Sequence, residues 1–238
     1  MKKITCLLIG ILAFLGCVNA QTAGENIDVT HYEIHLNSIN FTGHTLQCET
    51  YVTLNATANT STIVLELKSL TVGAVLCETT GFGINGFSQS GDLLTIELSE
   101  TLTEGQEIIL DILYGGNTFN EQWGGIMWTP GYVCNMGVGF ESIPHNLGKC
   151  WFPCVDNFTD KATYDVYVTV DSNLSAVCGG NLESTVDNGN GTKTVHYNMP
   201  QEIATYHISF VAGDYVEWTD TYNGIERDIP ITVYVKPA

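Results

Sequence analysis

Two histidines, His31 and His35, are the first residues whose types and spacing could do chemistry. Histidines four apart bind zinc in H-E-x-x-H helices, but that motif needs a glutamate directly after the first histidine, and Glu33 is displaced by one position. The surrounding residues alternate as in a strand, on which the two histidines share a face but lie roughly 13 Å apart. One zinc ion with bonds of about 2 Å cannot take both, so we expect structural or surface histidines.

Other catalytic patterns are missing. His44, His145, His196 and His207 are scattered, and sequence order cannot establish a Ser/His/Asp triad, which is defined by geometry. The sequence has no phosphate-binding G-x-x-x-x-G-K-[ST] loop and no dinucleotide-binding G-x-G-x-x-G turn. The Asn- and Gly-rich stretch 187–191 lacks the spaced carboxylates of a calcium loop and is typical of a hairpin turn. We therefore expect no catalytic residue and no metal ligand in this chain.

Cysteines are the next candidate set. Besides Cys6 and Cys17 near the N-terminus, the chain has Cys48, Cys77, Cys134, Cys150, Cys154 and Cys178. Six cysteines allow fifteen full disulfide pairings, and sequence alone does not choose among them. Cys150 and Cys154 cannot pair with each other in an extended segment, because their Cα atoms would lie roughly 13 Å apart. No C-x-x-C spacing supports structural zinc, so buried thiols and ordinary disulfides remain the two interpretations.

The most specific pattern is the segment 148–156, in which Gly148 and Lys149 precede a Phe-Pro-Cys-x-Asp core that ends at Asp156. Lys161-Ala162 and an aromatic residue follow at a fixed distance. This pattern resembles the hallmark of the N-terminal domain of the aminopeptidase N family of zinc aminopeptidases. The stretches 27–33, 174–180 and 204–215 resemble further strands of that domain, in the right order. The resemblance therefore covers nearly the whole chain after residue 20, and it suggests an Asp156–Lys161 ion pair that fixes the loop.

One departure from the family pattern concerns substrate binding. Ten and eight residues before the motif's Phe, the family places a Gln and a Gln or Glu that hold the substrate's α-amine. An ungapped count from Phe152 reaches position 142, a serine, and position 144, a proline, neither of which replaces a carboxylate. Glu141, His145 and Asn146 lie close by, so the resemblance makes them the candidate substrate-binding residues of a shifted loop. The alternative is a loop that only packs on the next domain.

The elements that must position these residues are β-strands almost throughout. Period-two or continuous apolar runs, rich in Val, Ile, Leu and Thr, predict strands at 27–36, 50–54, 62–67, 93–98, 108–114, 163–170, 193–198, 206–212 and 229–235. Turn signals lie at 90–92 and 187–191, and the Gly- and Trp-rich stretch 115–139 is expected to be a long loop. The fold class is therefore all-β, and the resemblance implies the saddle-like β-sandwich of the aminopeptidase N N-terminal domain.

Composition excludes several function classes. The chain is 44% hydrophobic and 14% charged, which is typical of a folded core and not of a disordered chain. Its 26 acidic and 8 basic residues give a formal net charge of −18. A surface this negative repels phosphates, so we expect neither nucleic acid nor anionic lipid as a partner. No stretch after residue 20 is apolar enough to span a membrane.

The first twenty residues are typical of a signal peptide. Lys2 and Lys3 precede a short apolar run, and residues 18–20 offer a cleavage site before Gln21. A lipoprotein modified at Cys17 is the alternative. We therefore expect export to a periplasm, a cell surface or the exterior. The expected organisation is a signal peptide over 1–20 and an aminopeptidase N-like N-terminal β-domain over 21–238, with the catalytic domain absent from this chain.

The resemblance also implies a function. It implies a non-catalytic domain that packs on its own C-terminal catalytic domain and caps the active site, which releases N-terminal amino acids from peptides. Zinc is expected in that missing domain, and no cofactor is expected in this chain. Two other classes stay open: an independent exported β-sandwich module that binds glycan or protein through Trp123, Trp128 and Trp151, and a structural cell-surface domain.

Overall fold

The structure is a computed structural model that describes residues 22–237. The predicted signal peptide, residues 1–20, lies outside the described residues, as do Cys6 and Cys17. In the described part the elements are strands and two short 3₁₀ helices, which confirms the all-β prediction. No helix in this range is long and apolar enough to cross a bilayer.

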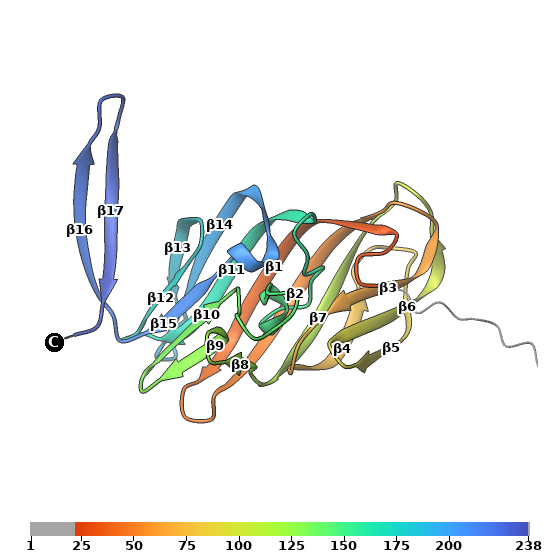
Figure 1. The fold of residues 1–238 in the computed structure, drawn as a ribbon, viewed down its shortest axis with the longest axis horizontal. Coiled ribbons are helices and arrows are strands. Elements are labelled where there is room, and N and C mark those ends of the chain that lie inside the picture. Colours follow the sequence, from red (N-terminus) through yellow and green to blue (C-terminus); the bar gives the residue numbers. More distant parts are fainter. Residues whose placement is uncertain (1–21, 238) are drawn as a thin grey trace, which may run out of the picture.

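A seven-stranded sheet forms the largest element of the fold, with its strands in the order β13-β14-β11-β1-β2-β7-β4 (Figure 1). Its strands β1 and β11 pair in parallel, and the other neighbouring strands pair antiparallel. In chain order the bounds are β1 (Ile27–Asn40), β2 (Thr45–Ala56), β4 (Thr71–Cys77), β7 (Glu107–Asn117), β11 (Lys161–Asp171), β13 (Asn181–Asp187) and β14 (Thr192–Ala204).

Two smaller sheets accompany the large one, a five-stranded sheet of order β12-β15-β10-β9-β8 and a three-stranded sheet of order β3-β6-β5. The five-stranded sheet contains β8 (Asn120–Glu121), β9 (Gly124–Thr129), β10 (Tyr132–Met136), β12 (Ser175–Cys178) and β15 (Phe210–Gly213). The three-stranded sheet contains β3 (Thr60–Glu66), β5 (Ile84–Ser90) and β6 (Leu93–Leu102). The 3₁₀ helices are η1 (Gly148–Cys150) and η2 (Thr205–His207).

One hydrophobic core joins the three sheets. Alternate side chains of β1 and β11, such as Ile34, Leu36 and Val166, are fully buried on the inner face of the large sheet. They belong to one cluster with Leu65 of β3 and Phe210 of β15. Burial of each such side chain contributes about 1.5–3 kcal/mol relative to exposure. The period-two pattern read from the sequence is therefore the pattern that builds this core.

The predicted strands overlap observed strands, and the turns at 90–92 and 187–191 connect β5 to β6 and β13 to β14. Two predictions were wrong. The stretch 115–139 is no long loop but contains β8, β9 and β10, because tight turns join these short strands, such as the turn before β10 in which Gly131 has a positive φ. The strand expected at 206–212 is divided into η2 and β15, and Thr205 at the start of η2 donates a hydrogen bond to a side chain of the 148–156 segment.

The last two strands, β16 (Val216–Asn223) and β17 (Asp228–Val235), form a separate two-stranded sheet that projects from the body (Figure 1). We call this pair the ribbon. Residues directly opposite each other share a face. The pairs on one face are Val216–Val235, Trp218–Val233, Asp220–Ile231 and Tyr222–Ile229, and those on the other face are Glu217–Tyr234, Thr219–Thr232, Thr221–Pro230 and Asn223–Asp228. The ribbon thus has one largely apolar face, whose large side chains are exposed.

All six cysteines of the described residues are free. Cys48, Cys150, Cys154 and Cys178 are buried, whereas Cys77 and Cys134 are partly exposed. Burial raises the pKa of both the Cys48 and the Cys150 thiol to about 12. Because the thiolate is the reactive form, these thiols resist oxidation without being paired. Of the two interpretations left open by the sequence, the structure supports thiols.

We predict that residues 21–238, purified without reductant, react with a thiol reagent in two stages. Only Cys77 and Cys134 should react quickly in the native state, and six thiols should react after unfolding, because four of them are buried. A chromogenic disulfide reagent, applied with and without guanidinium, measures both counts. Fewer than six thiols after unfolding would show that a disulfide exists.

Candidate functional site

The segment 148–156, singled out by its sequence pattern, runs through the core. Trp151, Phe152 and Cys154 are fully buried. Phe152 packs edge-on against Trp151, with 4.8 Å between ring centroids, and against Tyr32 at 5.2 Å. The Tyr114 hydroxyl donates to the Trp151 carbonyl at 3.0 Å, and Tyr32 accepts from a backbone N–H of the same segment. The motif therefore acts as a packing and hydrogen-bonding element.

An ion pair is buried beside this segment. Lys149, whose side chain is only 8% exposed, places Nζ 2.6 Å from Oε1 of Glu66 at the end of β3. Burial lowers the pKa of Lys149, but the hydrogen bond to Glu66 and the charges of Glu66 and Asp156 outweigh burial and leave this pKa raised. The backbones of Glu66 and Cys154 exchange two hydrogen bonds, so the pair and this bridge fasten the segment to β3.

Asp156 completes this group. Its Oδ1 accepts a 2.7 Å hydrogen bond from Thr205, its Oδ2 accepts from the Lys149 backbone, and its backbone N–H donates to Glu66. A Cβ at Gly148 would lie 2.9 Å from Asp156 Oδ1, which explains the small residue there. We call Glu66, Lys149, Asp156 and Thr205 the buried polar cluster. It ties β3, the segment 148–156 and η2 together.

The suggested ion pair between Asp156 and Lys161 was wrong. Asp156 is buried and its hydrogen bonds come from Thr205 and Lys149, whereas Lys161 is exposed at the start of β11. Among residues 22–237 no ion pair joins them. Lys161 was suggested because it lies close to Asp156 in the sequence. The buried ion pair is instead formed by Lys149, and its partner Glu66 lies 83 positions away in β3. No local spacing could have identified Glu66.

Residues 138–146, which we call the 138–146 loop, precede the buried segment and are held by a second carboxylate. Oε1 of Glu121 accepts the Glu141 N–H at 2.8 Å, and its Oε2 accepts the N–H and hydroxyl of Ser142. The Ser142 hydrogen bond and the backbone N–H donors lower the pKa of Glu121. Sequence reasoning missed Glu121, because it lies within the glycine-rich stretch interpreted as a loop.

The three predicted substrate-binding residues all lie in this loop but differ in exposure. Glu141 and His145 are exposed. Asn146 is 0% exposed, and its side-chain amide donates to the Asp156 carbonyl. Its Oδ1 is buried and has no hydrogen-bond partner among the described residues. The structure therefore presents two of these side chains to solvent and places the third below them, against the buried polar cluster.

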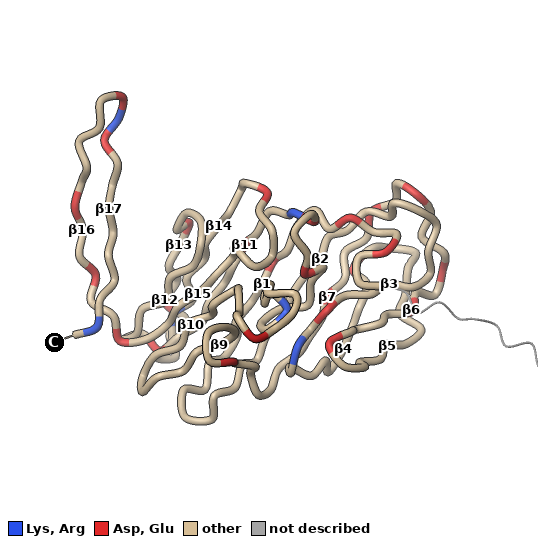
Figure 2. The backbone as a smooth tube through the Cα atoms, viewed as in Figure 1, with Lys and Arg blue, Asp and Glu red and all other residues tan. Residues whose placement is uncertain are grey.

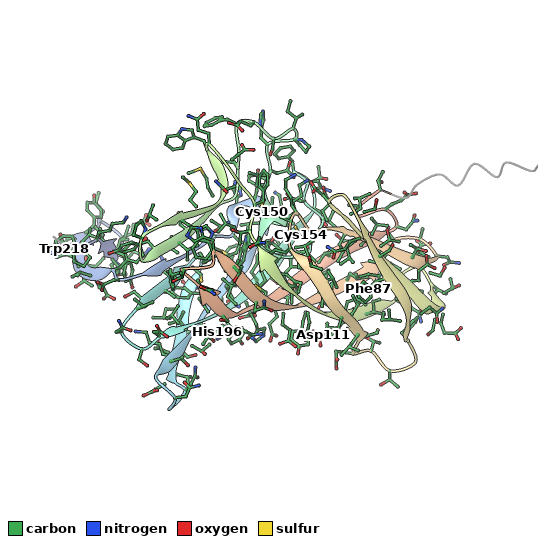
Figure 3. All side chains as sticks on the ribbon, turned by 90° about the horizontal axis from the view of Figure 1, so that it is seen from below. Phe87, Asp111, Cys150, Cys154, His196 and Trp218 are labelled. Atoms are coloured by element: carbon green, nitrogen blue, oxygen red, sulfur yellow. The ribbon has the colours of Figure 1, made fainter. Side chains whose placement is uncertain are left out.

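Exposed apolar side chains lie in the same loop as Glu141 and His145. Phe140 is 77% exposed and Ile143 is 90% exposed. Trp123 is also exposed, and its backbone carbonyl accepts a hydrogen bond from the Phe140 N–H. The loop projects from the upper side of the molecule in Figure 3, above Cys150 and Cys154. An exposed apolar surface that is held rigidly by hydrogen bonds is typical of an interaction surface.

The tryptophans considered for glycan binding do not form one platform. Trp151 is buried in the core, and Trp128 stacks on His44 with 5.0 Å between ring centroids while its indole donates to Thr118. Only Trp123 of the three is exposed.

Neither predicted surface histidine is arranged for zinc. His31 lies 2.8 Å from the Thr163 hydroxyl and 3.4 Å from Asp165, whereas His35 lies 2.7 Å from Glu33. No group of three or more His, Cys, Asp and Glu side chains in residues 22–237 could hold a metal ion. The zinc that the resemblance implies therefore has no ligand set in the part of the chain described here.

The described residues thus define an all-β domain with a buried, motif-bearing loop and two exposed apolar surfaces. A sequence profile described as the peptidase M1 N-terminal domain matches residues 29–207. The chain therefore belongs to the peptidase M1 N-terminal domain family.

Relatives of two kinds resemble the chain. It is 27% identical to a puromycin-sensitive aminopeptidase of Caenorhabditis elegans, over 88% of this chain and 22% of that protein. It is 33% identical to transcription initiation factor TFIID subunit 2 of Drosophila melanogaster, over 35% of this chain and 7% of that protein. The chain thus spans a minor part of the curated relatives it matches.

A solved structure shares the fold. An M1 zinc metallopeptidase of Deinococcus radiodurans, with a Tyr-Ser-Ala substrate bound, superimposes with a TM-score of 0.74 at 24% identity. The superposition covers 87% of this chain and 47% of that chain.

We predict that Lys149→Met destabilises the domain by roughly 3 kcal/mol, because it leaves the Glu66 carboxylate buried without its cation. Adding Glu66→Gln should recover part of the loss, since the amide oxygen still accepts the Asp156 N–H and the buried Glu66 charge is removed. Urea unfolding followed by tryptophan fluorescence measures these free energies.

Lys161→Met is the matched control for this experiment. Lys161 is exposed and in no ion pair of the described residues, so its loss should change the free energy of unfolding by less than about 0.5 kcal/mol. Equal costs for the two substitutions would contradict the role given to Lys149.

Proposed function

We propose that this chain is the N-terminal domain of an exported, zinc-dependent aminopeptidase, in which it packs on a catalytic domain and caps the active site. The observation that carries the proposal is the 138–146 loop, in which an exposed carboxylate, Glu141, lies within a rigidly held apolar surface. Membership of the peptidase M1 N-terminal domain family supports a peptidase context.

The role of the loop in substrate binding follows from its chemistry. An aminopeptidase distinguishes its substrate by a free, positively charged amine, which an exposed carboxylate binds through charge-assisted hydrogen bonds. Glu141 supplies that carboxylate, and Glu121 fixes its position through the Glu141 backbone N–H. His145 lies in the same loop, and Asn146 positions the loop through the Asp156 carbonyl. This chain would thus contribute binding and orientation, not the bond-breaking groups.

The ribbon supports packing on a further domain. A two-stranded hairpin is marginally stable by itself in water, and the apolar face that contains Trp218, Tyr222 and Ile229 is exposed. A catalytic domain of the same polypeptide that covers this face would stabilise the ribbon. Burial of such apolar surface contributes about 25 cal/mol per Å².

The chemistry of bond cleavage lies outside this chain. A peptidase domain with bound zinc supplies an activated water for attack on the peptide bond. The residues of this chain hold the substrate's amine on one side of that reaction and exclude solvent with Phe140 and Ile143. Export, proposed from the pattern of residues 1–20, is compatible with the buried thiols, which need no disulfide to resist oxidation.

A non-catalytic role is the second candidate. The Drosophila protein that resembles part of the chain is named as a transcription initiation factor subunit, so a related domain occurs in a protein whose name is not that of a peptidase. Because fold alone does not define function, the chain could equally serve as an interaction module. The exposed apolar surfaces fit either role, and an activity measurement separates the two.

The proposal is tested on the longest gene product that contains this chain, beside residues 21–238. We expect the long form to hold about one zinc ion per chain and to release an N-terminal amino acid from a chromogenic amide, whereas residues 21–238 do neither. A long form that is free of metal and inactive would contradict the peptidase proposal and favour the interaction module.

In an active long form, we predict that Glu141→Gln raises the KM for a peptide amide roughly 10-fold to 100-fold, because a charge-assisted hydrogen bond contributes about 1.5–3 kcal/mol to binding. Glu104→Gln, which removes an exposed carboxylate from the turn before β7, is the matched control and should leave KM unchanged. If Glu141→Gln behaves like this control, the loop only packs on the next domain.

A further inference from the structure

The outer face of the seven-stranded sheet lies on the side of the sheet opposite the buried segment. Figure 3 shows Asp111 and His196 on the lower side of the sheet and Cys150 and Cys154 above it. The proposed active-site cap therefore makes no use of the outer face. The part of this face that concerns Asp111 is formed by β1, β2, β7 and β4, which lie side by side in that order, with β4 at the edge of the sheet.

Asp111 in β7 has an unusual environment on this face. It is only 5% exposed, and its Oδ1 is buried without a hydrogen-bond partner among the described residues. Its cross-strand neighbours are Tyr51 in β2 and Leu76 in β4. A buried carboxylate oxygen without a partner costs free energy, so it marks a position where a donor is missing.

Among the described residues, the charged groups around Asp111 supply no lysine or arginine cation. Burial, followed by the charges of Glu49 and Glu78 and a hydrogen bond shared with Glu49, raises the pKa of Asp111 to about 6, and His35 opposes this shift. No lysine or arginine of residues 22–237 is among the groups that act on it. Figure 2 shows acidic positions over all parts of the chain and few basic ones. The site therefore has an excess of negative charge.

Apolar surface lies directly beside this carboxylate. Leu76, opposite Asp111, is half exposed, and Leu113, two positions further along β7, is also exposed. Leu113 lines a hollow of about 500 Å³ together with Asn37, Gln47, Thr71 and Gly73. No charged side chain of the described residues lines this hollow. Residues two apart on a strand share a face and lie about 7 Å apart.

We propose that this outer face binds an extended segment of a partner protein that carries an arginine or lysine at Asp111 and an apolar side chain two residues away in the hollow beside Leu113. The cation would donate to the unpartnered Oδ1 and neutralise the group formed by Asp111, Glu49 and Glu78. A strand with side chains at positions i and i+2 matches the 7 Å spacing of the two subsites.

The basic side chain comes from a partner because no lysine or arginine of residues 22–237 is among the groups that act on Asp111. Lys149 is paired with Glu66 on the inner side of the sheet, and Lys68 is paired with Asp92. A bound metal ion fits less well, because no group of three ligands in residues 22–237 could hold one. A guanidinium needs only one carboxylate in suitable geometry, and it forms two parallel hydrogen bonds with it.

The test uses the peptide acetyl-Ser-Arg-Ser-Leu-Ser-amide as a probe, titrated into residues 21–238 by calorimetry at pH 6 and 7.5. The control peptide replaces the arginine by citrulline, which has the same shape without the charge. We expect binding of the arginine peptide that is at least tenfold tighter than binding of the citrulline peptide. Replacing the leucine by serine should also weaken binding, because the hollow then stays unfilled.

Proton release provides a second measurement. At pH 6 about half of the Asp111 carboxyl is protonated, and a guanidinium stabilises the ionised form. Binding should therefore release roughly half a proton per peptide at pH 6 and almost none at pH 7.5. Titrations in two buffers with different ionisation enthalpies measure this release.

Asp111→Asn is the decisive variant, and Glu100→Gln is its control. The asparagine has almost the same size and removes the raised-pKa carboxylate, so it should not lower the Tm at pH 7.5 but should weaken peptide binding at least tenfold. Glu100 is exposed in β6, and its loss changes the net charge equally without altering the outer face. The proposal is overturned if the arginine peptide does not bind, if citrulline binds equally well, or if Asp111→Asn retains full binding.

Discussion

The fold depends on one internal constraint, the ion pair between Lys149 and Glu66 within the buried polar cluster. The segment 148–156 passes through the core, where its backbone polar groups and its charges cannot be solvated. Their desolvation is tolerated because Glu66, Asp156 and Thr205 supply partners from β3, from the segment itself and from η2. The same contacts fix the end of the 138–146 loop, since Asn146 donates to the Asp156 carbonyl. Removing one charge would leave the other buried and unpaired.

Most of the fold could be predicted because period-two burial is a local property of each strand. β1 and β11 alternate in sequence as they do in the structure, and their inward residues form the core. The short strands β8 to β10 could not be predicted, because strands of two to six residues separated by tight turns carry too little periodicity. The buried ion pair could not be predicted for another reason: Glu66 ends β3 and Lys149 lies in η1, and only the fold brings them together.

The candidate site was predicted only to the level of its loop. Counting from Phe152 identified the region that contains Glu141 and His145, and the structure places both at the surface. The exposure of a loop residue depends on its long-range supports, here Glu121 and Asp156, which no spacing within the loop reveals. The sequence could not distinguish Asn146 from its neighbours, but its side chain is buried where it donates to the Asp156 carbonyl. The unpaired Oδ1 of Asp111 can likewise be recognised only once its neighbours across the sheet are known.

Two exposed apolar surfaces, the 138–146 loop and the ribbon, connect the fold to the proposed packing on a catalytic domain. Amide hydrogen exchange tests this packing most directly, by comparing the longest gene product that contains this chain with residues 21–238. We predict that β16, β17 and residues 138–146 exchange at least tenfold more slowly in the long form, while β1 and β11 exchange equally in both. Equal exchange of the ribbon and the loop in the two forms would contradict the account.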